Sequence, residues 1–445
     1  MSELYKFSPF SHKFDLGDGH IALFHSLDFE LIFMRNSDYE KVRRNIKSGS
    51  STALEYYPIL KRNNFVVCDL DYEWKRYFNL RRTLLGEPRI NMLYLLLTTD
   101  CNFRCNYCYV DKSMASYMSE SVVSHAIESF ISSYVGNDDE LLIIFYGGEP
   151  LLNFNVLTQS VKYAKQVCRM FNKKTELLNF QLITNGSLLN TKIVNFLADE
   201  NVSVAVSLDG PKSINDIARK YRTGRSSFDD TLKGIELIKK KDMSFSISCT
   251  IGKHNLFSLP EVFKWFYEKI GTSEIGFNII QGKNSNQINE HLLSQIADQI
   301  INCFKISRNF NIYEQKIMRT VNAFVNKEVY PVDCGGCGRQ LVITPDATYG
   351  PCPGFIGNNT YFKQLPIKDI NKDQVFIEWS NRSPLKIDAC VKCEALGICG
   401  GGCPYHAYIN SGSIWELDKR HCTYIKNLLK WLVFDTYYQI KNQGH

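Results

Sequence analysis

Six short apolar runs between residues 91 and 280 alternate with stretches of helical periodicity. The runs are MLYLLLT (92–98), LLIIF (141–145), FQLI (180–183), VSVAV (202–206), FSISCT (245–250) and EIGFNI (274–279). After the first run, apolar residues recur three and four positions apart, as at Val123, Ile127 and Phe130, which is typical of helices packed on strands. A repeated strand–helix unit closes most easily into a barrel. We therefore predict an α/β fold, a partial (β/α)6 TIM-type barrel.

Polar and glycine residues directly follow the first four runs. They are Cys101, Cys105 and Cys108 after the first, YGGEP (146–150) after the second, TNG (184–186) after the third and SLDGP (207–211) after the fourth. The carboxyl ends of barrel strands share one rim, where active sites are built. We expect these segments to converge there.

Residues 1–88 predict a separate, winged-helix-like domain. HIALFHSLDFELIFM (20–34) predicts paired strands, and residues 36–49 predict a helix with a capping box at Ser37 and Glu40 and a stop at Gly49. Further helices are expected over 53–64 and 71–82, with a strand over 65–69 between them. The other predicted parts are the barrel (89–285), a helical bridge (286–330), a cysteine-rich domain (331–425) and an amphipathic C-terminal helix (426–445).

Composition excludes few partners but does indicate a compartment. Lys and Arg number 52 against 46 Asp and Glu, an excess too mild to indicate nucleic acid or a membrane surface. No cationic segment precedes an apolar stretch at the N-terminus, and no apolar run approaches the roughly 20 residues of a membrane helix. We expect a cytoplasmic protein. In that reducing compartment, 15 cysteines indicate metal or redox chemistry rather than disulfides.

Eleven of the cysteines fall into two spaced groups, and four lie singly in apolar or amphipathic stretches. The four are expected to be core or inert thiols: Cys68, Cys168, Cys249 and Cys303.

The first group, Cys101, Cys105 and Cys108, places three thiolates on one loop. Thiolates select zinc, copper(I) or iron–sulfur clusters. A structural zinc site uses four protein ligands, whereas a [4Fe–4S] cube held by three cysteines leaves one iron open to a ligand that is not protein. The loop predicts a reactive cluster. The alternatives are a zinc site completed from elsewhere or three incidental thiols.

With these motifs in this order, residues 91–280 resemble the radical S-adenosylmethionine (SAM) enzymes. Their signature is a Cys-x3-Cys-x2-Cys loop after the first barrel strand, with an aromatic residue, here Tyr107, before the last cysteine. The resemblance implies that the open iron binds SAM. It also implies that the reduced cluster cleaves SAM to methionine and a 5′-deoxyadenosyl radical, which removes a hydrogen atom from the substrate.

The resemblance also implies SAM-binding residues at the other strand ends. Gly147, Gly148 and Glu149 would lie along the SAM amino group, since glycine lets the backbone approach a ligand and a carboxylate accepts from an ammonium. Ser207 would reach the ribose or carboxylate, and Asn185 the nucleoside. Alone, the glycine pair would predict only a turn, and so would the Asn-Gly pair at Asn185.

Arg219 matches an arginine that clamps the SAM carboxylate. Its alternative is a solvated basic stretch, since Lys220, Arg222 and Arg225 follow. Many relatives have His-Asp before this arginine, whereas this chain has Asn215-Asp216.

The second group holds eight cysteines between residues 334 and 422 and resembles the SPASM extension of radical SAM enzymes. Glycine-rich spacers suit a chain folded tightly around a cluster; two zinc ribbons are the alternative. The resemblance implies one auxiliary cluster on Cys334, Cys337, Cys352 and Cys403 and another on Cys390, Cys393, Cys399 and Cys422. The expected cofactors are therefore three [4Fe–4S] clusters and SAM.

Two features indicate the substrate. Sulfatase-maturing relatives place an Asp base directly after the cysteine aligned with Cys352, where this chain has Pro353. Residues 1–88 resemble the peptide-recognition domain of maturases of ribosomally made peptides, which binds a leader as an added strand. Basic residues of the first helix would complement an acidic leader or form a solvated face: Lys41, Arg43, Arg44 and Lys47.

We therefore predict a radical SAM peptide maturase that cross-links side chains of a precursor peptide through a thioether or carbon–carbon bond. Expected partners are that peptide with its leader and a flavodoxin- or ferredoxin-type electron donor, with no nucleic acid or membrane. Alternatives are a sulfatase-maturing type of enzyme, a peptide epimerase and, as a non-enzyme, an iron–sulfur winged-helix regulator.

Overall fold

The computed structural model describes residues 5–48, 56–110, 114–134, 140–280, 290–310 and 312–443. The chain forms two compact units. The terminal unit comprises Met1–Gly86, Met318–Cys334 and Arg382–His445, and the barrel unit comprises Glu87–Ile317 and Gly335–Asn381. The boundary expected between barrel and bridge, at residues 285 and 286, lies outside the described residues.

All six strands predicted for the barrel are present, are parallel and begin and end within two residues of the expected positions. In β6 and β7 consecutive residues are buried, which means that both faces of these strands are covered, and this explains their continuous apolar runs. The strands are β6 (Met92–Thr98), β7 (Leu141–Gly147), β8 (Leu178–Thr184), β9 (Val202–Ser207), β10 (Phe245–Ile251) and β11 (Glu274–Ile279).

The sheet continues beyond these six strands on both sides and stays open among the described residues. Its order is β12-β11-β10-β9-β8-β7-β6-β13-β14-β15, parallel from β12 to β13 and antiparallel thereafter. The bridge predicted to be helical thus contributes a strand, β12, which is too short to leave a periodic signal. The added strands are β12 (Tyr313–Glu314), β13 (Gln340–Ile343), β14 (Thr348–Gly350) and β15 (Lys363–Gln364).

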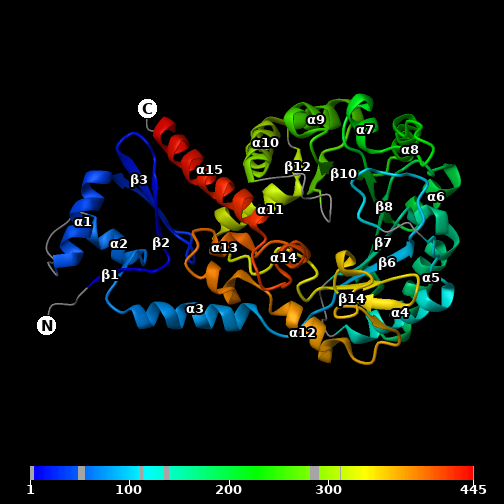
Figure 1. The fold of residues 1–445 in the computed structure, drawn as a ribbon, viewed down its shortest axis with the longest axis horizontal. Coiled ribbons are helices and arrows are strands. Elements are labelled where there is room, and N and C mark those ends of the chain that lie inside the picture. The colour runs from blue at the N-terminus through cyan, green and yellow to red at the C-terminus, as the bar shows by residue number, and fades with distance from the viewer. Residues whose placement is uncertain are drawn as a thin grey trace. The chain divides into compact units, whose positions relative to one another are not determined.

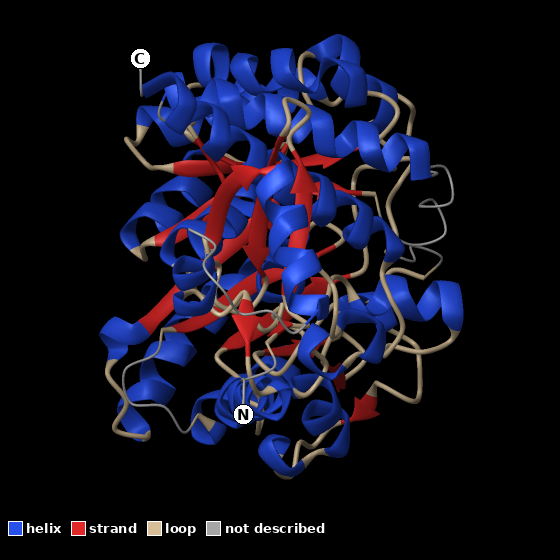
Figure 2. Ribbon diagram, turned by 90° about the vertical axis from the view of Figure 1, so that its left-hand side faces the viewer, coloured by secondary structure: helices blue, strands red, loops and turns tan. Residues whose placement is uncertain are grey.

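Helices cover the outer side of the barrel strands (Figures 1 and 2). In α4 the buried residues recur three and four positions apart, and the Ser119 side chain accepts a hydrogen bond from the Val122 N–H at the helix start. The helices of this unit are α4 (Glu120–Ser133), α5 (Phe154–Met170), α6 (Thr191–Asp199), α7 (Lys212–Ala218), α8 (Phe228–Lys240), α9 (Leu259–Trp265), α10 (Glu290–Phe310) and α12 (Gln374–Ser380), with α11 (Gln315–Asn326) continuing into the terminal unit.

In the terminal unit, the N-terminal residues form the predicted strands and helices. β2 (Ser11–Asp15), β3 (His20–His25) and β4 (Leu31–Arg35) make an antiparallel sheet, and β1 (Lys6–Phe7) pairs with β5 (Val66–Val67). The helices are α1 (Asn36–Ser48), α2 (Tyr57–Arg62), α3 (Leu70–Leu84), α13 (Leu396–Cys399), α14 (Pro404–Ser411) and α15 (Lys419–Gln443). The designation of residues 1–88 as a winged helix stays a prediction.

The predicted capping box of the first helix is wrong. α1 begins at Asn36, directly after β4, so Ser37 lies inside the first turn, whereas a capping residue stands just outside the helix. The expected stop at Gly49 and the side chain of Lys47 lie outside the described residues.

The N-terminal segment shares a core with the C-terminal part of the chain. Phe10 and Tyr77 pack with Leu385 and Leu396 in one buried cluster, and the Tyr77 hydroxyl donates a hydrogen bond of 2.6 Å to the carbonyl of Leu385. Residues 1–86 are therefore one part of the terminal unit, and their removal would expose apolar surface on residues 382–445.

Candidate functional site

The three-cysteine loop follows β6 directly and is ordered by its own backbone. Cys101 is buried, whereas Cys105 and Cys108 are partly exposed. The Phe103 N–H donates to the sulfur of Cys101 over 3.3 Å, and the buried Phe103 ring packs edge-on against Tyr221. Three thiols on one loop, one receiving an amide N–H, suit an iron–sulfur cluster with an open iron.

A second segment, residues 218–225 after α7, runs beside this loop. Phe103 and Tyr221 form an antiparallel bridge, and three backbone hydrogen bonds tie the two segments: Arg104 N to Lys220 O (2.7 Å), Asn106 N to Ala218 O (3.0 Å) and Arg222 N to Asn102 O (3.2 Å). The basic stretch of the sequence is therefore fixed to the cysteine loop.

The glycine pair at the end of β7 lies against the start of the same loop. The Gly148 N–H donates to Thr98 O and the Glu149 N–H to Asp100 O, both over 2.7 Å. A Cβ on Gly147 would lie 2.3 Å from Thr98 O, and one on Gly148 would lie 2.0 Å from Asp100 O. Gly147 also has a φ of 144°, which favours glycine. These glycines allow backbone to meet backbone, a contact that the sequence did not predict.

Glu149 is fully buried and links the ends of β7 and β8. One carboxylate oxygen accepts from the Thr184 hydroxyl (2.7 Å) and the Leu151 N–H (3.2 Å), and the other accepts from the Asn185 N–H (2.8 Å). Burial raises the pKa of the carboxyl to about 7, against the opposing effect of these donors. Both oxygens have protein partners, so Glu149 can position the neighbouring segments whether or not it meets a ligand.

Asn185 connects the end of β8 to the cysteine loop. Its side-chain amide donates to Asn102 Oδ1 (2.8 Å) and lies 4.0 Å from the sulfur of Cys101, and its oxygen accepts from Ser187. These contacts go beyond a simple Asn-Gly turn, because they join two strand ends.

Arg219 is buried, so its assignment to a solvated basic stretch is wrong. Its Nε lies 3.1 Å from an oxygen of the buried Asp209 but makes no aligned hydrogen bond, and its guanidinium lies over the Tyr107 ring, 5.4 Å from the centroid. Burial favours the neutral form, yet the charge of Asp209 keeps the pKa of Arg219 well above its usual value. A buried guanidinium with unused donor capacity suits a carboxylate ligand.

Asp209 and His254 are site residues that sequence reasoning missed. Asp209 accepts from the Tyr107 hydroxyl (2.7 Å), from His254 Nε2 (3.2 Å) and from the Thr250 N–H (2.9 Å). Asp209 thereby ties the aromatic residue of the cysteine signature to the end of β10. The signal was available: Asp209 follows the fourth apolar run and His254 follows the fifth, as the other site residues follow theirs.

Ser207, the last residue of β9, pairs with Ser248 of β10 at the same end of the sheet. It is partly exposed. All six residues predicted to contact SAM thus occupy the carboxyl ends of β7, β8 and β9 or the segment after α7. Their contacts with SAM remain a prediction.

A pair of tyrosines, also missed, stands beside the loop. The hydroxyls of Tyr109 and Tyr146 lie 2.9 Å apart. Burial raises the pKa of Tyr146, with smaller contributions from the thiols of Cys108 and Cys352. This part of the barrel unit therefore brings a cysteine of the first group near a cysteine of the second.

The structure gathers the four cysteines expected to bind the second auxiliary cluster. All four belong to the terminal unit, and each influences another's charge: burial and then neighbouring thiols raise the pKa of Cys390 to about 12, with Cys422 and Cys393 as those neighbours. Burial also raises the pKa of Cys399 well above its usual value, and the thiols of Cys422 and Cys390 raise it further. The Gly401 N–H donates to the sulfur of Cys399 over 3.4 Å, as expected for backbone amides facing cluster ligands.

The set expected for the first auxiliary cluster is divided. Cys334 and Cys403 lie near each other in the terminal unit, where burial and then the Cys334 thiol raise the pKa of Cys403 to about 12. Cys337 and Cys352 belong to the barrel unit. Among the described residues no three His, Cys, Asp or Glu side chains are arranged to hold one metal ion. The cluster ligands stay predictions, supported by these groupings of thiols.

Of the four single cysteines, Cys168, Cys249 and Cys303 are buried as predicted, whereas Cys68 is exposed.

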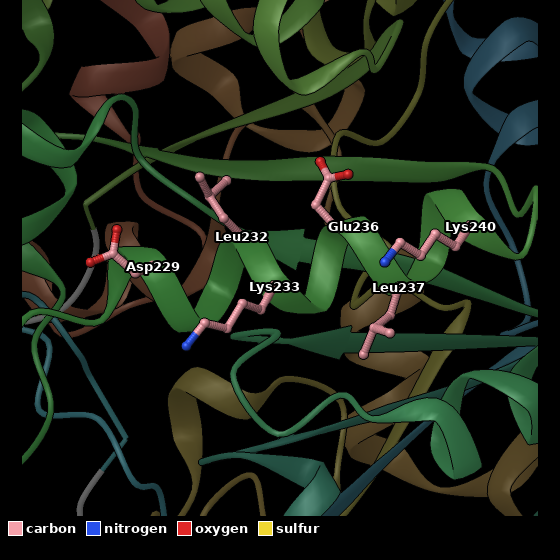
Figure 3. Close-up of a pocket in the computed structure, with 6 residues that line it drawn as sticks. All are labelled: Asp229, Leu232, Lys233, Glu236, Leu237 and Lys240. Atoms are coloured by element: carbon pink, nitrogen blue, oxygen red, sulfur yellow. The ribbon is translucent and has the colours of Figure 1, made fainter.

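A shallow depression elsewhere on the barrel unit holds none of the predicted site residues. It is lined by residues of α8 alone (Figure 3): Asp229, Leu232, Lys233, Glu236, Leu237 and Lys240. In the part of the chain that is described, no helix has the length and apolar character needed to span a bilayer.

A family model described as the Radical SAM superfamily matches residues 95–266, which include the cysteine loop and every predicted SAM contact. The chain is a radical SAM enzyme. The resemblance drawn from the sequence is confirmed, and the alternative of a non-enzyme regulator is wrong.

Two curated relatives of this radical SAM enzyme extend the match beyond the barrel. The radical SAM cyclopropyl synthase TigE of Paramaledivibacter caminithermalis is 25% identical over 374 residues, covering 80% of this chain and 76% of TigE. The cysteine-type anaerobic sulfatase-maturating enzyme of Clostridium perfringens is 24% identical over 341 residues, covering 71% of this chain and 89% of that enzyme.

Solved structures share the fold of this radical SAM enzyme. Native anSMEcpe with bound AdoMet superposes with a TM-score of 0.67 at 20% identity, covering 80% of this chain and 99% of anSMEcpe. Streptococcus suis SuiB bound to its precursor peptide SuiA superposes with a TM-score of 0.58 at 13% identity, covering 94% of this chain and 99% of SuiB.

The glycine contact predicts a specific structural lesion. Gly148→Ala forces a Cβ into the Asp100 carbonyl, so either the loop or β7 must move, and overpacking of this kind costs about 1–3 kcal/mol of the free energy of unfolding. We expect a lower Tm and less iron bound per chain than in the wild type. Gly86→Ala is the matched control, because a Cβ there has no neighbour within 4 Å. Normal iron content in Gly148→Ala would contradict the role of this contact.

Glu149→Gln replaces one acceptor oxygen with an amide that faces N–H or O–H donors. Leaving such buried groups unsatisfied costs about 1–3 kcal/mol of the free energy of unfolding. Because burial raises the folded-state pKa of Glu149 to about 7, the folded protein holds its proton more tightly than the unfolded chain. The wild type therefore loses stability as pH rises from about 4.5 to about 7. In urea unfolding, the deficit of Glu149→Gln should be larger at pH 5 than at pH 8; a constant deficit would contradict this assignment.

Proposed function

We propose that this enzyme modifies a ribosomally made precursor peptide and forms an intramolecular thioether or carbon–carbon bond in it. The observation that carries the proposal is the combination of a radical SAM barrel with a second unit that has a grouped set of cysteines and, within the described residues, strands β2 and β4 unpaired on their outer edges. When bound, the reduced cluster and SAM would supply the 5′-deoxyadenosyl radical that removes a hydrogen atom from the peptide.

The residues of this chain would hold SAM at the end of the barrel. Cys101, Cys105 and Cys108 would hold the cluster. Arg219, kept charged by Asp209, would bind the SAM carboxylate, and Ser207 would lie near the ribose. Glu149 would act mainly by fixing Asn185 and the glycine pair, since its oxygens already accept three hydrogen bonds.

The auxiliary clusters would belong to a SPASM-type extension and take up the surplus electron of bond formation. The grouping of Cys390, Cys393, Cys399 and Cys422 supports one cluster, and the pairing of Cys334 with Cys403 supports part of another. We assign no residue as a proton acceptor for the substrate.

Relatives support a peptide substrate and favour carbon–carbon bond formation. TigE is a cyclopropyl synthase by name. SuiB has been solved with a bound precursor peptide, and its fold matches 94% of this chain. The sulfatase-maturating relatives support the alternative of a sulfatase-maturing enzyme. In this chain, however, the residue after Cys352 is Pro353, which begins a short 3-10 helix. Proline has no side-chain group to accept a proton.

A leader peptide would bind in the terminal unit as an added strand. The register of hydrogen bonds, with His25 N donating to Glu30 O and Asn36 N to Gly19 O, turns the Phe33 N–H of β4 away from β3. On the other side of β3, the Ser26 N–H donates to Phe10 O. The same alternation of hydrogen-bonded and non-hydrogen-bonded pairs points the Lys13 N–H of β2 away from β3. Within the described residues neither strand pairs on its outer edge, so each offers backbone groups to a peptide.

The cluster assignment predicts the effect of removing its ligands. Replacing Cys101, Cys105 and Cys108 together with Ala should abolish 5′-deoxyadenosine formation under anaerobic conditions with dithionite and SAM, and should lower bound iron by about one third, because two of three clusters remain. Chromatography and iron analysis measure both quantities. Unchanged 5′-deoxyadenosine formation would refute the assignment.

The leader proposal predicts that one strand edge is sensitive to proline but not to alanine. Proline removes an outward N–H and blocks strand addition, whereas alanine at the same position keeps it. If the precursor peptide adds to β2, Lys13→Pro should weaken its binding at least tenfold; if it adds to β4, Phe33→Pro should do so. The matching alanine variant, Lys13→Ala or Phe33→Ala, should stay within about threefold of the wild-type affinity. Titration calorimetry with the intact enzyme measures this. Wild-type affinity in both proline variants would rule out the proposed binding mode.

A further inference from the structure

Arg382 is a fully buried cation beside the spacer between Cys399 and Cys403. It belongs to the terminal unit, as do the residues that it contacts. Its guanidinium donates four hydrogen bonds, and every acceptor is a backbone carbonyl. The acceptors are the carbonyls of Gly401 (2.7 Å), Gly402 (3.0 Å), Ile414 (2.6 Å) and Glu416 (3.4 Å). Arg382 therefore fixes the course of the three-glycine spacer.

Among the described residues, no carboxylate forms an ion pair with Arg382. The terminal unit offers a contrast in Arg420, also buried, whose Nε lies 3.5 Å from a carboxylate oxygen of Asp418. Fully buried arginines are rare unless a negative group accompanies them, because moving a charge out of water costs free energy that neutral acceptors return only in part. The surroundings of Arg382 therefore suit a nearby anion that is not a carboxylate.

The charge of Arg382 acts on thiols of the set expected to hold the second auxiliary cluster. Burial raises the pKa of Cys390 to about 12 and that of Cys422 to about 11, and the charge of Arg382 is among the effects that oppose both increases. Lys426 acts on the same two thiols, but it is exposed and pairs with Glu394 over 3.1 Å. Of these two cations, only Arg382 is buried and without a carboxylate partner.

Gly401 connects Arg382 to a third thiol of this set. Its carbonyl accepts from Arg382, and its N–H donates to the sulfur of Cys399 over 3.4 Å. Gly401 has a φ of 84°, and a Cβ there would lie 3.2 Å from a guanidinium nitrogen, so glycine suits this close approach. Arg382 thus helps to hold an amide N–H against a sulfur. Hydrogen bonds to cluster sulfurs and nearby charge both tune the reduction potential of an iron–sulfur cluster.

We propose that Arg382 is a positioning residue that raises the reduction potential of the auxiliary cluster held by Cys390, Cys393, Cys399 and Cys422. A cluster bound by four thiolates is anionic, and one added electron makes it more so. A buried cation with neutral partners stabilises that added charge more than an exposed cation does, because water and salt screen it less. One electron enters the cluster, and no bond forms or breaks. The inference rests on the auxiliary cluster proposed above but not on a peptide substrate.

Arg382→Gln tests this assignment, because glutamine removes the charge but keeps an amide donor for the spacer carbonyls. In the reconstituted holoenzyme at a fixed applied potential, the ratio of reduced to oxidised cluster should fall about tenfold, which corresponds to a potential about 59 mV lower for a one-electron couple. EPR spectra at a series of applied potentials measure this ratio. The cluster of the cysteine loop is recognised by its response to added SAM. Of the other two clusters, one should shift and the other should stay within twofold; two unchanged ratios would overturn the proposal.

Two further variants separate the buried charge from the hydrogen bonds and from charge in general. Arg382→Lys keeps the charge but not all four hydrogen bonds, and its ratio should stay within about threefold of the wild type. Lys426→Gln, the matched control, removes an exposed and paired cation near the same thiols and should stay within twofold. Equal shifts in Arg382→Gln and Arg382→Lys would overturn the proposal by assigning the effect to hydrogen bonding. A tenfold shift in Lys426→Gln would overturn it too, since burial would then be irrelevant.

Iron analysis covers the case in which Arg382→Gln no longer holds the cluster. Loss of about one third of the iron from Arg382→Gln, with retention in Arg382→Lys, would support the need for charge, whereas equal loss from both would overturn the proposal.

The wild type separates this inference from the cluster proposal on which it rests. About twelve irons per chain, as three [4Fe–4S] clusters require, with potentials that do not respond to Arg382→Gln would refute this inference alone. A wild type with clearly fewer irons would refute the three-cluster assignment and this inference together.

Discussion

The close approach of the Gly147-Gly148 backbone to residues 98–100 is the contact on which the rest of the site depends. It places the last residue of β6, Thr98, and the nearby Asp100 against the end of β7, with separations that allow no Cβ on either glycine. From there the Glu149 carboxylate reaches Asn185 at the end of β8, and Asn185 reaches back to Asn102 in the cysteine loop. Three strand ends are thus linked by one ring of backbone and side-chain hydrogen bonds.

A second set of contacts anchors the other side of the loop. Asp209 holds Tyr107 and His254 and offsets the charge of the buried Arg219. A buried ion pair of this kind stabilises a site only when other donors satisfy the remaining oxygens, and here a tyrosine, a histidine and a backbone amide do so. The cysteine loop is therefore fixed from β7 and β8 through Glu149 and from β9 and β10 through Asp209.

The barrel strands and the cysteine motifs could be predicted from the sequence because their signals are local. Two of the six runs, residues 92–97 and 141–145, are continuously apolar, and in the others polar or small residues stand between the apolar ones, as is usual in strands. A three-thiolate loop after a strand has few chemical interpretations. Strands such as β12, with two residues, carry no period to detect. The role of the glycine pair and the position of Asp209 depended on which backbone lies opposite, and nothing near them in the chain specifies that. The capping box at Ser37 failed because β4 runs directly into the helix without the turn that such a box requires.

The make-up of the terminal unit has a consequence for synthesis. Phe10 and Tyr77 find their core partners Leu385 and Leu396 only after three hundred further residues have been added. During translation residues 1–86 must therefore remain without these partners while the barrel is synthesised. Their apolar residues are exposed to solvent in that state, which is prone to aggregation or to binding by chaperones. The barrel unit, in contrast, is nearly continuous from Glu87 to Ile317 and can collapse early. Slow elongation late in the message would lengthen this vulnerable interval.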